Sequence, residues 1–200
     1  GENKTVDVVV DIFNRVNTGG TKLSKGDLAL AKICAEWPEA RAELSNRLER
    51  WRQAGFNFRL EWLLRCVNAV ITGEAFFTAL DKVTPQEFHD GLIEAEKSID
   101  LLLNMIASRL GLDHDRVLKS HFAFPLMTRY LVQRDGKLTN YHERDKLLYW
   151  YIHTFLWGRY SGTTESVLSQ DLNVINEQKG DVDDLIELLR QNRGDLRIHP

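Results

Sequence analysis

The sequence predicts an all-α protein, an irregular bundle of about eight helices. Three observations lead to this prediction. Apolar residues recur three and four positions apart along most of the chain, which places them on one face of a helix. Only 4 of the 200 residues are proline, so few positions would break a helix. No segment alternates apolar and polar residues in the manner of a half-buried strand.

Glycine and proline mark most of the expected boundaries. Pro38 and Pro125 stand where helices begin, and Gly73 and Gly111 stand where helices end. The expected helices cover residues 5–17, 25–36, 38–53, 59–72, 85–110, 125–134, 141–158, 167–176 and 181–191, with a short amphipathic piece over 74–81. No linker or internal repeat divides them, so one helical unit is favoured.

The clearest helix start is TPQE at residues 84–87. Thr84 can cap the helix, Pro85 occupies its first position, and Glu87 completes a capping box. Apolar residues then step by four and three up to Ile106, which gives the helix one continuous apolar face. This repeat is too short to require a coiled coil, so a helix in the core of a bundle is predicted.

Two further features concern packing and capping. Residues 141–158 are rich in aromatic side chains and look apolar on both faces, which predicts a central helix. Acidic residues cluster at 113–115 and at 181–184. Carboxylates favour the first turn of a helix, so both clusters are expected to cap helix starts, with His114 as part of the first cap.

Composition excludes several classes of protein. The net charge of −3 argues against a chain that binds nucleic acid over its whole surface, although a local basic patch stays possible. Cys34 and Cys66 each lie in an apolar helical segment, which is typical of reduced core cysteines in a cytoplasmic protein. The start, GENKTVD, has no signal-peptide pattern, and the longest apolar stretch, 147–158, is shorter than the roughly 20 residues that span a bilayer.

No local metal or catalytic motif is present. The six histidines are scattered, without an H-x-x-x-H pair, and there is no Cys-x-x-Cys. His153, within the aromatic helix, is interpreted as a hydrogen-bonded interior residue. We therefore predict no metal site and no cofactor bound by this chain alone, and we assign no catalytic residue.

The segment 39–65 is rich in arginine, with a local excess of two positive charges over its glutamates and with two tryptophans among them. Its Arg47, Arg50 and Arg52 are candidates for contact with a DNA backbone. A solvated helix face with ion pairs within the helix explains the same pattern, and this second interpretation is favoured.

Residues 13–24 read FNRVNTGGTKLS. By local chemistry, Gly19 and Gly20 form a helix C-cap and turn, and no Gly-Lys-Ser/Thr sequence of the Walker type follows them. The same stretch could bind a phosphate, because Arg15 offers a fork of donors, Asn17 a directional contact, and the glycines a close approach of the backbone.

The string IFNRVNTGGTKLSKGDLALAKI resembles the Phe-x-Arg-x-Asn-x-Gly-Gly-x-x-Leu-Ser segment of the ParB-like domain of GmrSD-type restriction endonucleases. Further along, RYSGTTESVLSQDL resembles the region that follows the helical part of that family. The match is specific over residues 12–30 and looser elsewhere, with the same order along the chain.

This resemblance implies a bacterial defence protein, in which a nucleotide-hydrolysing ParB-like domain is coupled to an HNH-type nuclease that cuts foreign or modified DNA. Arg15, Asn17, Gly19 and Gly20 would then border the nucleotide site. The full-length protein would use a nucleoside triphosphate and a divalent metal. Residues 1–24 would end the ParB-like domain, and residues 25–200 would form its helical extension.

The chain departs from the family pattern in ways that affect activity. The Asp-Gly-Gln-Gln-Arg motif expected upstream is absent, as is a histidine-rich nuclease motif. The expectation is therefore a middle piece that is inactive alone and works with the remainder of the same polypeptide. Two alternatives stay open: a stand-alone helical module that binds protein or DNA, and, less favoured, an enzyme complete within these residues.

Overall fold

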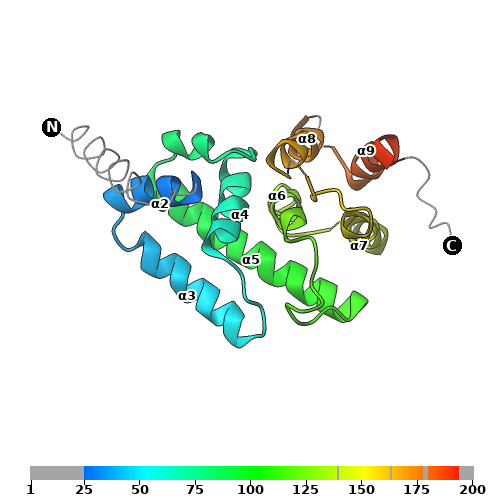
Figure 1. Ribbon diagram of the computed structural model, residues 1–200, viewed down its shortest axis with the longest axis horizontal. Coiled ribbons are helices and arrows are strands. Elements are labelled where there is room, and N and C mark those ends of the chain that lie inside the picture. The colour runs from blue at the N-terminus through cyan, green and yellow to red at the C-terminus, as the bar shows by residue number, and fades with distance from the viewer. Residues whose placement is uncertain (1–24, 139, 163, 178–179, 194–200) are drawn as a thin grey trace.

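The computed structural model describes residues 25–138, 140–162, 164–177 and 180–193, and all regular structure within these ranges is helical. The predicted all-α class is therefore confirmed. Figure 1 shows the helices as an irregular bundle. The helix expected over residues 5–17 and the glycine turn that follows it lie outside the described residues.

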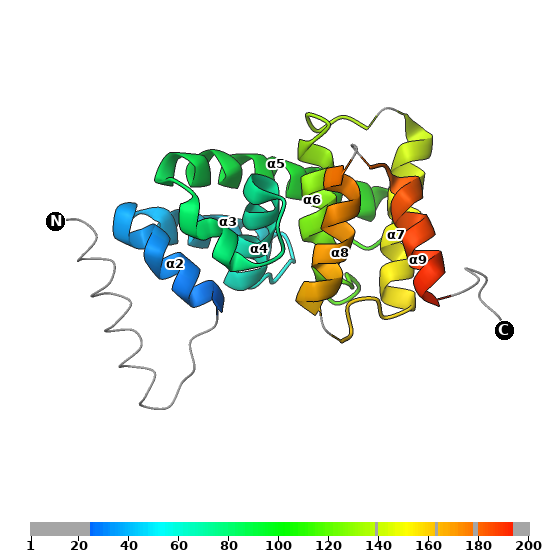
Figure 2. The ribbon, with the colours of Figure 1, turned by 90° about the horizontal axis from the view of Figure 1, so that it is seen from above.

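The first group of helices covers residues 25 to 110. It contains α2 (Lys25–Glu36), α3 (Ala40–Gln53), α4 (Leu60–Thr72), the short 3₁₀ helix η1 (Phe77–Lys82) and α5 (Pro85–Leu110). The second group contains the 3₁₀ turn η2 (His121–Ala123), α6 (Phe124–Val132), α7 (Tyr141–Leu156), α8 (Thr164–Asn176) and α9 (Val182–Arg193). Figure 2 shows the two groups side by side.

The two groups share one hydrophobic core. Helix α6 packs against both α4 and α5, and α5 runs along both groups (Figures 1 and 2). With 26 residues, α5 is about 39 Å long, enough to reach across two layers of helices. Buried apolar side chains from both groups form a single contiguous cluster. The described helices therefore pack as one unit.

Local signals set the helix ends as expected. The Thr84 side chain accepts a hydrogen bond from the Glu87 N–H, while Glu87 accepts one from the Thr84 N–H at 2.8 Å, which completes the capping box. Gly73 and Gly111 end α4 and α5 with φ angles of 73° and 68°, a left-handed conformation that glycine adopts without strain. At α9, Asp184 accepts from the Asp181 N–H at 3.0 Å.

The central helix is α4, and the prediction that residues 141–158 are central was wrong. Every residue of α4 from 62 to 70 is buried, because α2, α3, η1, α5 and α6 pack around it. Helix α7 buries one face only, and Tyr141 and Leu156 are 61% and 50% exposed. Aromatic content misled the prediction because the polar tips of tyrosine and tryptophan let them lie at a surface.

The acidic cluster at 113–115 does not begin a helix, contrary to expectation. Residues 114–117 form a turn, in which the Asp115 N–H donates to the Gly55 carbonyl at 3.1 Å and His114 Nδ1 accepts from the Arg116 N–H at 3.2 Å. The cluster therefore ties the end of α5 to the α3–α4 connection. Asx-type chemistry suits turns and helix caps equally well, so sequence alone could not separate the two.

Candidate functional site

A polar pocket of about 590 Å³ lies where the first turns of α2 and α8 meet the side of α4. It is lined by Lys25, Glu61, Arg65, Phe76, Phe122, Gly162, Thr164, Glu165 and Ser166. Lys25 directly follows FNRVNTGGTKLS, and residues 162, 164, 165 and 166 belong to RYSGTTES. The fold thus brings the end of one of these segments beside the other, although about 140 residues separate them in the chain. We call this the α2–α8 pocket.

Arg65 is the buried centre of the α2–α8 pocket, with only 4% of its surface exposed. Its Nη1 donates to Glu165 Oε1 at 3.1 Å and to the Ala75 carbonyl at 3.2 Å, and its Nη2 donates to Glu61 Oε1 at 3.1 Å. A guanidinium group stays charged throughout the pH range in which proteins are folded, so a buried one needs carboxylate and carbonyl partners of this kind.

Aromatic rings complete the surroundings of Arg65. The guanidinium carbon lies 4.6 Å from the centre of the Phe77 ring and 5.1 Å from that of Phe122. Both separations are within the range of a cation–π interaction. The arginine is therefore held by two carboxylates, a carbonyl and two aromatic rings, and these contacts fix its position.

Glu165 joins three helices through its two carboxylate oxygens. One oxygen accepts from Arg65 on α4, and the other lies 3.3 Å from Lys25 Nζ on α2. Glu165 itself lies in the first turn of α8, where a carboxylate also interacts favourably with the helix dipole. Glu165 therefore links the first turns of α2 and α8 to the side of α4.

A second buried cluster holds the loop that leads into α8. The Arg159 guanidinium donates to both oxygens of Asp171, with Nε to Oδ2 at 2.8 Å, and the Tyr160 hydroxyl donates to Oδ2 at 2.6 Å. Asp171 is 1% exposed. Burial, and then the neighbouring Asp171 carboxylate, raise the pKa of the Tyr160 phenol, so it remains a neutral donor. These contacts tie residues 159 and 160 to α8.

The chemistry available in the α2–α8 pocket is recognition by charge. Its nine lining residues provide two cations and two carboxylates, together with the hydroxyls of Thr164 and Ser166. They include no histidine or cysteine, and no base is seen hydrogen-bonded to either hydroxyl among the described contacts. Among the described lining residues the pocket therefore offers charged groups and hydroxyls, without a nucleophile–base pair.

The predicted nucleotide-binding residues Arg15, Asn17, Gly19 and Gly20 lie outside the described residues. The predicted DNA-binding arginines are described, and each is engaged by carboxylates of the chain. Arg47 pairs with Glu43 and Glu96, Arg50 with Glu96 and Asp100, and Arg52 with Glu49, at distances from 2.5 to 2.9 Å. Arg50 and Arg52 keep 48% and 62% of their side chains exposed.

Sequence reasoning missed the roles of Arg65 and Glu165. It grouped Arg65 with the other arginines of 39–65 and treated the Glu165 region as a loop. One signal was available for Arg65, because it is the one charged residue in the largely apolar run WLLRCVNAV on a helix. A charge in such a run is rarely buried unless it is paired, which points to a partner elsewhere in the fold.

Burial tests two further sequence predictions, those for His153 and for the cysteines. His153 is 7% exposed and its Nδ1 lies 2.8 Å from the Tyr149 carbonyl, so it is the interior, hydrogen-bonded residue expected. Both cysteines are free, with Cys66 buried and Cys34 partly so. Burial raises the pKa of the Cys66 thiol, which makes it unreactive.

The described residues hold neither a cluster of metal ligands nor a helix able to span a membrane. They contain no group of three or more histidine, cysteine or acidic side chains placed to hold a metal ion. None of their helices combines the length and the apolar character that crossing a bilayer requires. Comparison of the chain with models of known protein families and with curated proteins found no match.

Proposed function

We propose that this chain is the helical part of a GmrSD-like bacterial defence protein, acting in the cytoplasm in nucleotide-dependent restriction of foreign or modified DNA. The observation that carries the proposal is the convergence at the α2–α8 pocket. The two segments that resemble this family, far apart in the chain, meet through the contact of Lys25 with Glu165. Chance resemblance of two strings gives no reason for them to adjoin in space.

In this proposal the helices form a scaffold beside the nucleotide site. Arg15, Asn17, Gly19 and Gly20 contact the phosphates of a nucleoside triphosphate, and a divalent metal accompanies it in the full-length protein. The start of α2 follows this segment within a few residues. Lys25–Glu165 and Lys32–Asp81, the latter at 2.6 Å, then connect α2 to α8 and η1. The scaffold relays the state of the nucleotide site to an HNH-type nuclease elsewhere in the polypeptide.

The test is nucleotide binding and hydrolysis by the full-length polypeptide, with ATP and GTP as probes. Arg15→Ala should weaken binding on the order of tenfold to a hundredfold, because a charge-assisted hydrogen bond contributes roughly 1.5–3 kcal/mol. Glu165→Gln should leave nucleotide affinity unchanged and uncouple hydrolysis from DNA cleavage. Glu187→Gln, at an exposed residue of α9, is the matched control.

Two results would end the proposal. One is an Arg15→Ala protein that binds and hydrolyses nucleotide like the wild type. The other is turnover by residues 1–200 alone, which would favour an enzyme complete within this chain.

The alternative is a stand-alone helical module that binds DNA through Arg47, Arg50 and Arg52. The partial exposure of Arg50 and Arg52 favours it, while their pairing with carboxylates counts against it. Affinity for a DNA duplex that falls steeply with salt, and falls further in Arg50→Ala and Arg52→Ala, would support this alternative.

A further inference from the structure

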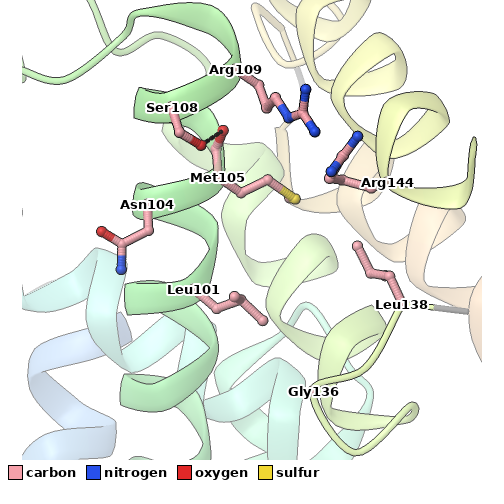
Figure 3. A pocket seen from close by; sticks show the side chains of 8 residues that line it. All are labelled: Leu101, Asn104, Met105, Ser108, Arg109, Gly136, Leu138 and Arg144. Atoms are coloured by element: carbon pink, nitrogen blue, oxygen red, sulfur yellow. Dashed lines mark hydrogen bonds between the residues drawn. The ribbon is translucent and has the colours of Figure 1, made fainter. Parts of the chain in front are cut away.

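A second cavity, a groove of about 510 Å³, lies between the C-terminal half of α5, the α6–α7 connection and the start of α7 (Figure 3). We call it the α5–α7 groove. It is lined by Leu101, Asn104, Met105, Ser108, Arg109, Gly136, Leu138 and Arg144. None of these residues belongs to the α2–α8 pocket, and none has a part in the proposed function.

The floor of the α5–α7 groove is apolar. Figure 3 shows Leu101 and Met105 extending from α5 toward Leu138 of the connection, while Asn104 points away. Leu101 is 40% exposed, unlike its neighbours Leu102 and Ile106, which are fully buried in the core. Leu101, Met105 and Leu138 therefore give the groove an apolar floor built from two segments of the chain.

Two arginines stand at one end of this floor. Figure 3 shows the guanidinium groups of Arg109 and Arg144 directed toward one another across the groove. Arg144 is held by Asp145, with Nη2 to Oδ1 at 2.9 Å. The Arg109 side chain has neither a hydrogen bond nor an ion pair with any described residue. No carboxylate lines the groove, although the chain as a whole is acidic.

We propose that the α5–α7 groove docks a short peptide segment of a partner protein, in which an aliphatic side chain is flanked by carboxylates. The aliphatic side chain packs on Leu101, Met105 and Leu138. A carboxylate three or four positions away accepts hydrogen bonds from Arg109 and relieves its repulsion with Arg144. Nucleic acid would satisfy the arginines but would leave the aliphatic floor uncovered, so a peptide fits both halves of the groove.

The experiment is selection from a phage-displayed library of random 12-residue peptides, with residues 1–200 as bait. The double variant Arg109→Glu/Arg144→Glu is used for counter-selection. The expected sequences carry Asp or Glu within four positions of Leu, Ile, Met or Phe. The strongest peptide is then measured by fluorescence polarisation against each variant, and circular dichroism verifies that each variant is folded.

Affinity for the selected peptide should fall about tenfold or more in the double variant, and also in Leu101→Ser. Arg41→Glu is the matched control, because Arg41 is exposed on α3 and does not line the groove, and it should change affinity less than twofold. Raising salt should weaken the wild-type complex through the lost attraction of the carboxylates.

Three outcomes would overturn the proposal. The selection could yield no acidic–aliphatic consensus. The peptide could bind the double variant as well as the wild type. Alternatively, another occupant could be found: a DNA duplex whose binding requires Arg109 and Arg144, or a second copy of the chain, detected as self-association that Leu101→Ser abolishes in sedimentation.

Discussion

The α2–α8 pocket and the α5–α7 groove both contain arginines, and the two regions use them in opposite ways. Arg65 is buried and shared between Glu61 and Glu165, so its charge is neutralised by the chain itself. Arg109 is exposed and has no partner among the described residues. A neutralised, buried arginine holds elements together, whereas an exposed arginine beside an apolar floor is available to a ligand. The comparison separates a structural junction from a docking surface.

The largest difference between the regions should appear in stability when Arg65 is removed. Arg65→Ala leaves Glu165 and Glu61 without their cation and takes away the contacts with Phe77 and Phe122. We expect a loss of about 3 kcal/mol, at the lower end for a broken buried pair because Glu61 keeps access to solvent. Urea denaturation followed by circular dichroism measures it. An effect as small as that of Arg109→Ala would contradict the structural role of Arg65.

An intermediate effect should follow from pH, through His121 next to the pocket wall. Burial lowers the pKa of His121, although the nearby Asp115 carboxylate partly opposes this and Lys119 adds to it. Because its folded pKa lies below the unfolded value of about 6.5, the unfolded chain takes up the proton first. Stability should therefore be full above that pH and decline as the pH falls toward the folded pKa.

The measurement for His121 is the urea midpoint between pH 7.5 and 5.5. His121→Gln should flatten the slope, and His142→Gln, at an exposed histidine of α7, serves as the control. An unchanged slope in His121→Gln would assign the pH dependence to another group.

The smallest effect is expected in the α5–α7 groove. Arg109→Ala should change stability by less than about 0.5 kcal/mol, since it removes no partner and relieves the repulsion from Arg144. The dependence on salt provides a second test. Added NaCl should stabilise the wild type slightly more than the variant, because it screens the repulsion between Arg109 and Arg144. A loss of stability above about 1 kcal/mol would mean that Arg109 has a structural role. That result would contradict the assignment of Arg109 as the unpaired cation of the groove.

Much of the helical framework was predictable, because its signals are local. The capping box of Thr84 and Glu87 and the left-handed glycines at 73 and 111 act within four residues of the chain. Helix periodicity likewise depends on neighbours three and four positions away. The all-α class and most helix ends follow from such short-range chemistry.

The prediction of which helix is central could not be local. Residues 62–70 are buried because five elements surround them, and residues 141–156 are half-exposed because few do. Their sequences do not record how many neighbours each will have. The turn at 113–115 shows the same limit, since its main-chain partner is Gly55, about 60 residues earlier.

By itself, the sequence determined the fold class, most helix boundaries and the family-like segments at 12–30 and 159–172. Only the tertiary structure decided which charges are paired. Arg65 and Glu165 are 100 residues apart, and Arg109 and Arg144 come from different helices. The physical reason is that an ion pair depends on distance in space and on burial, and both are set by how the helices pack together. Arginine therefore has a structural role in one region, where it is buried and paired, and is exposed and available to a ligand in the other.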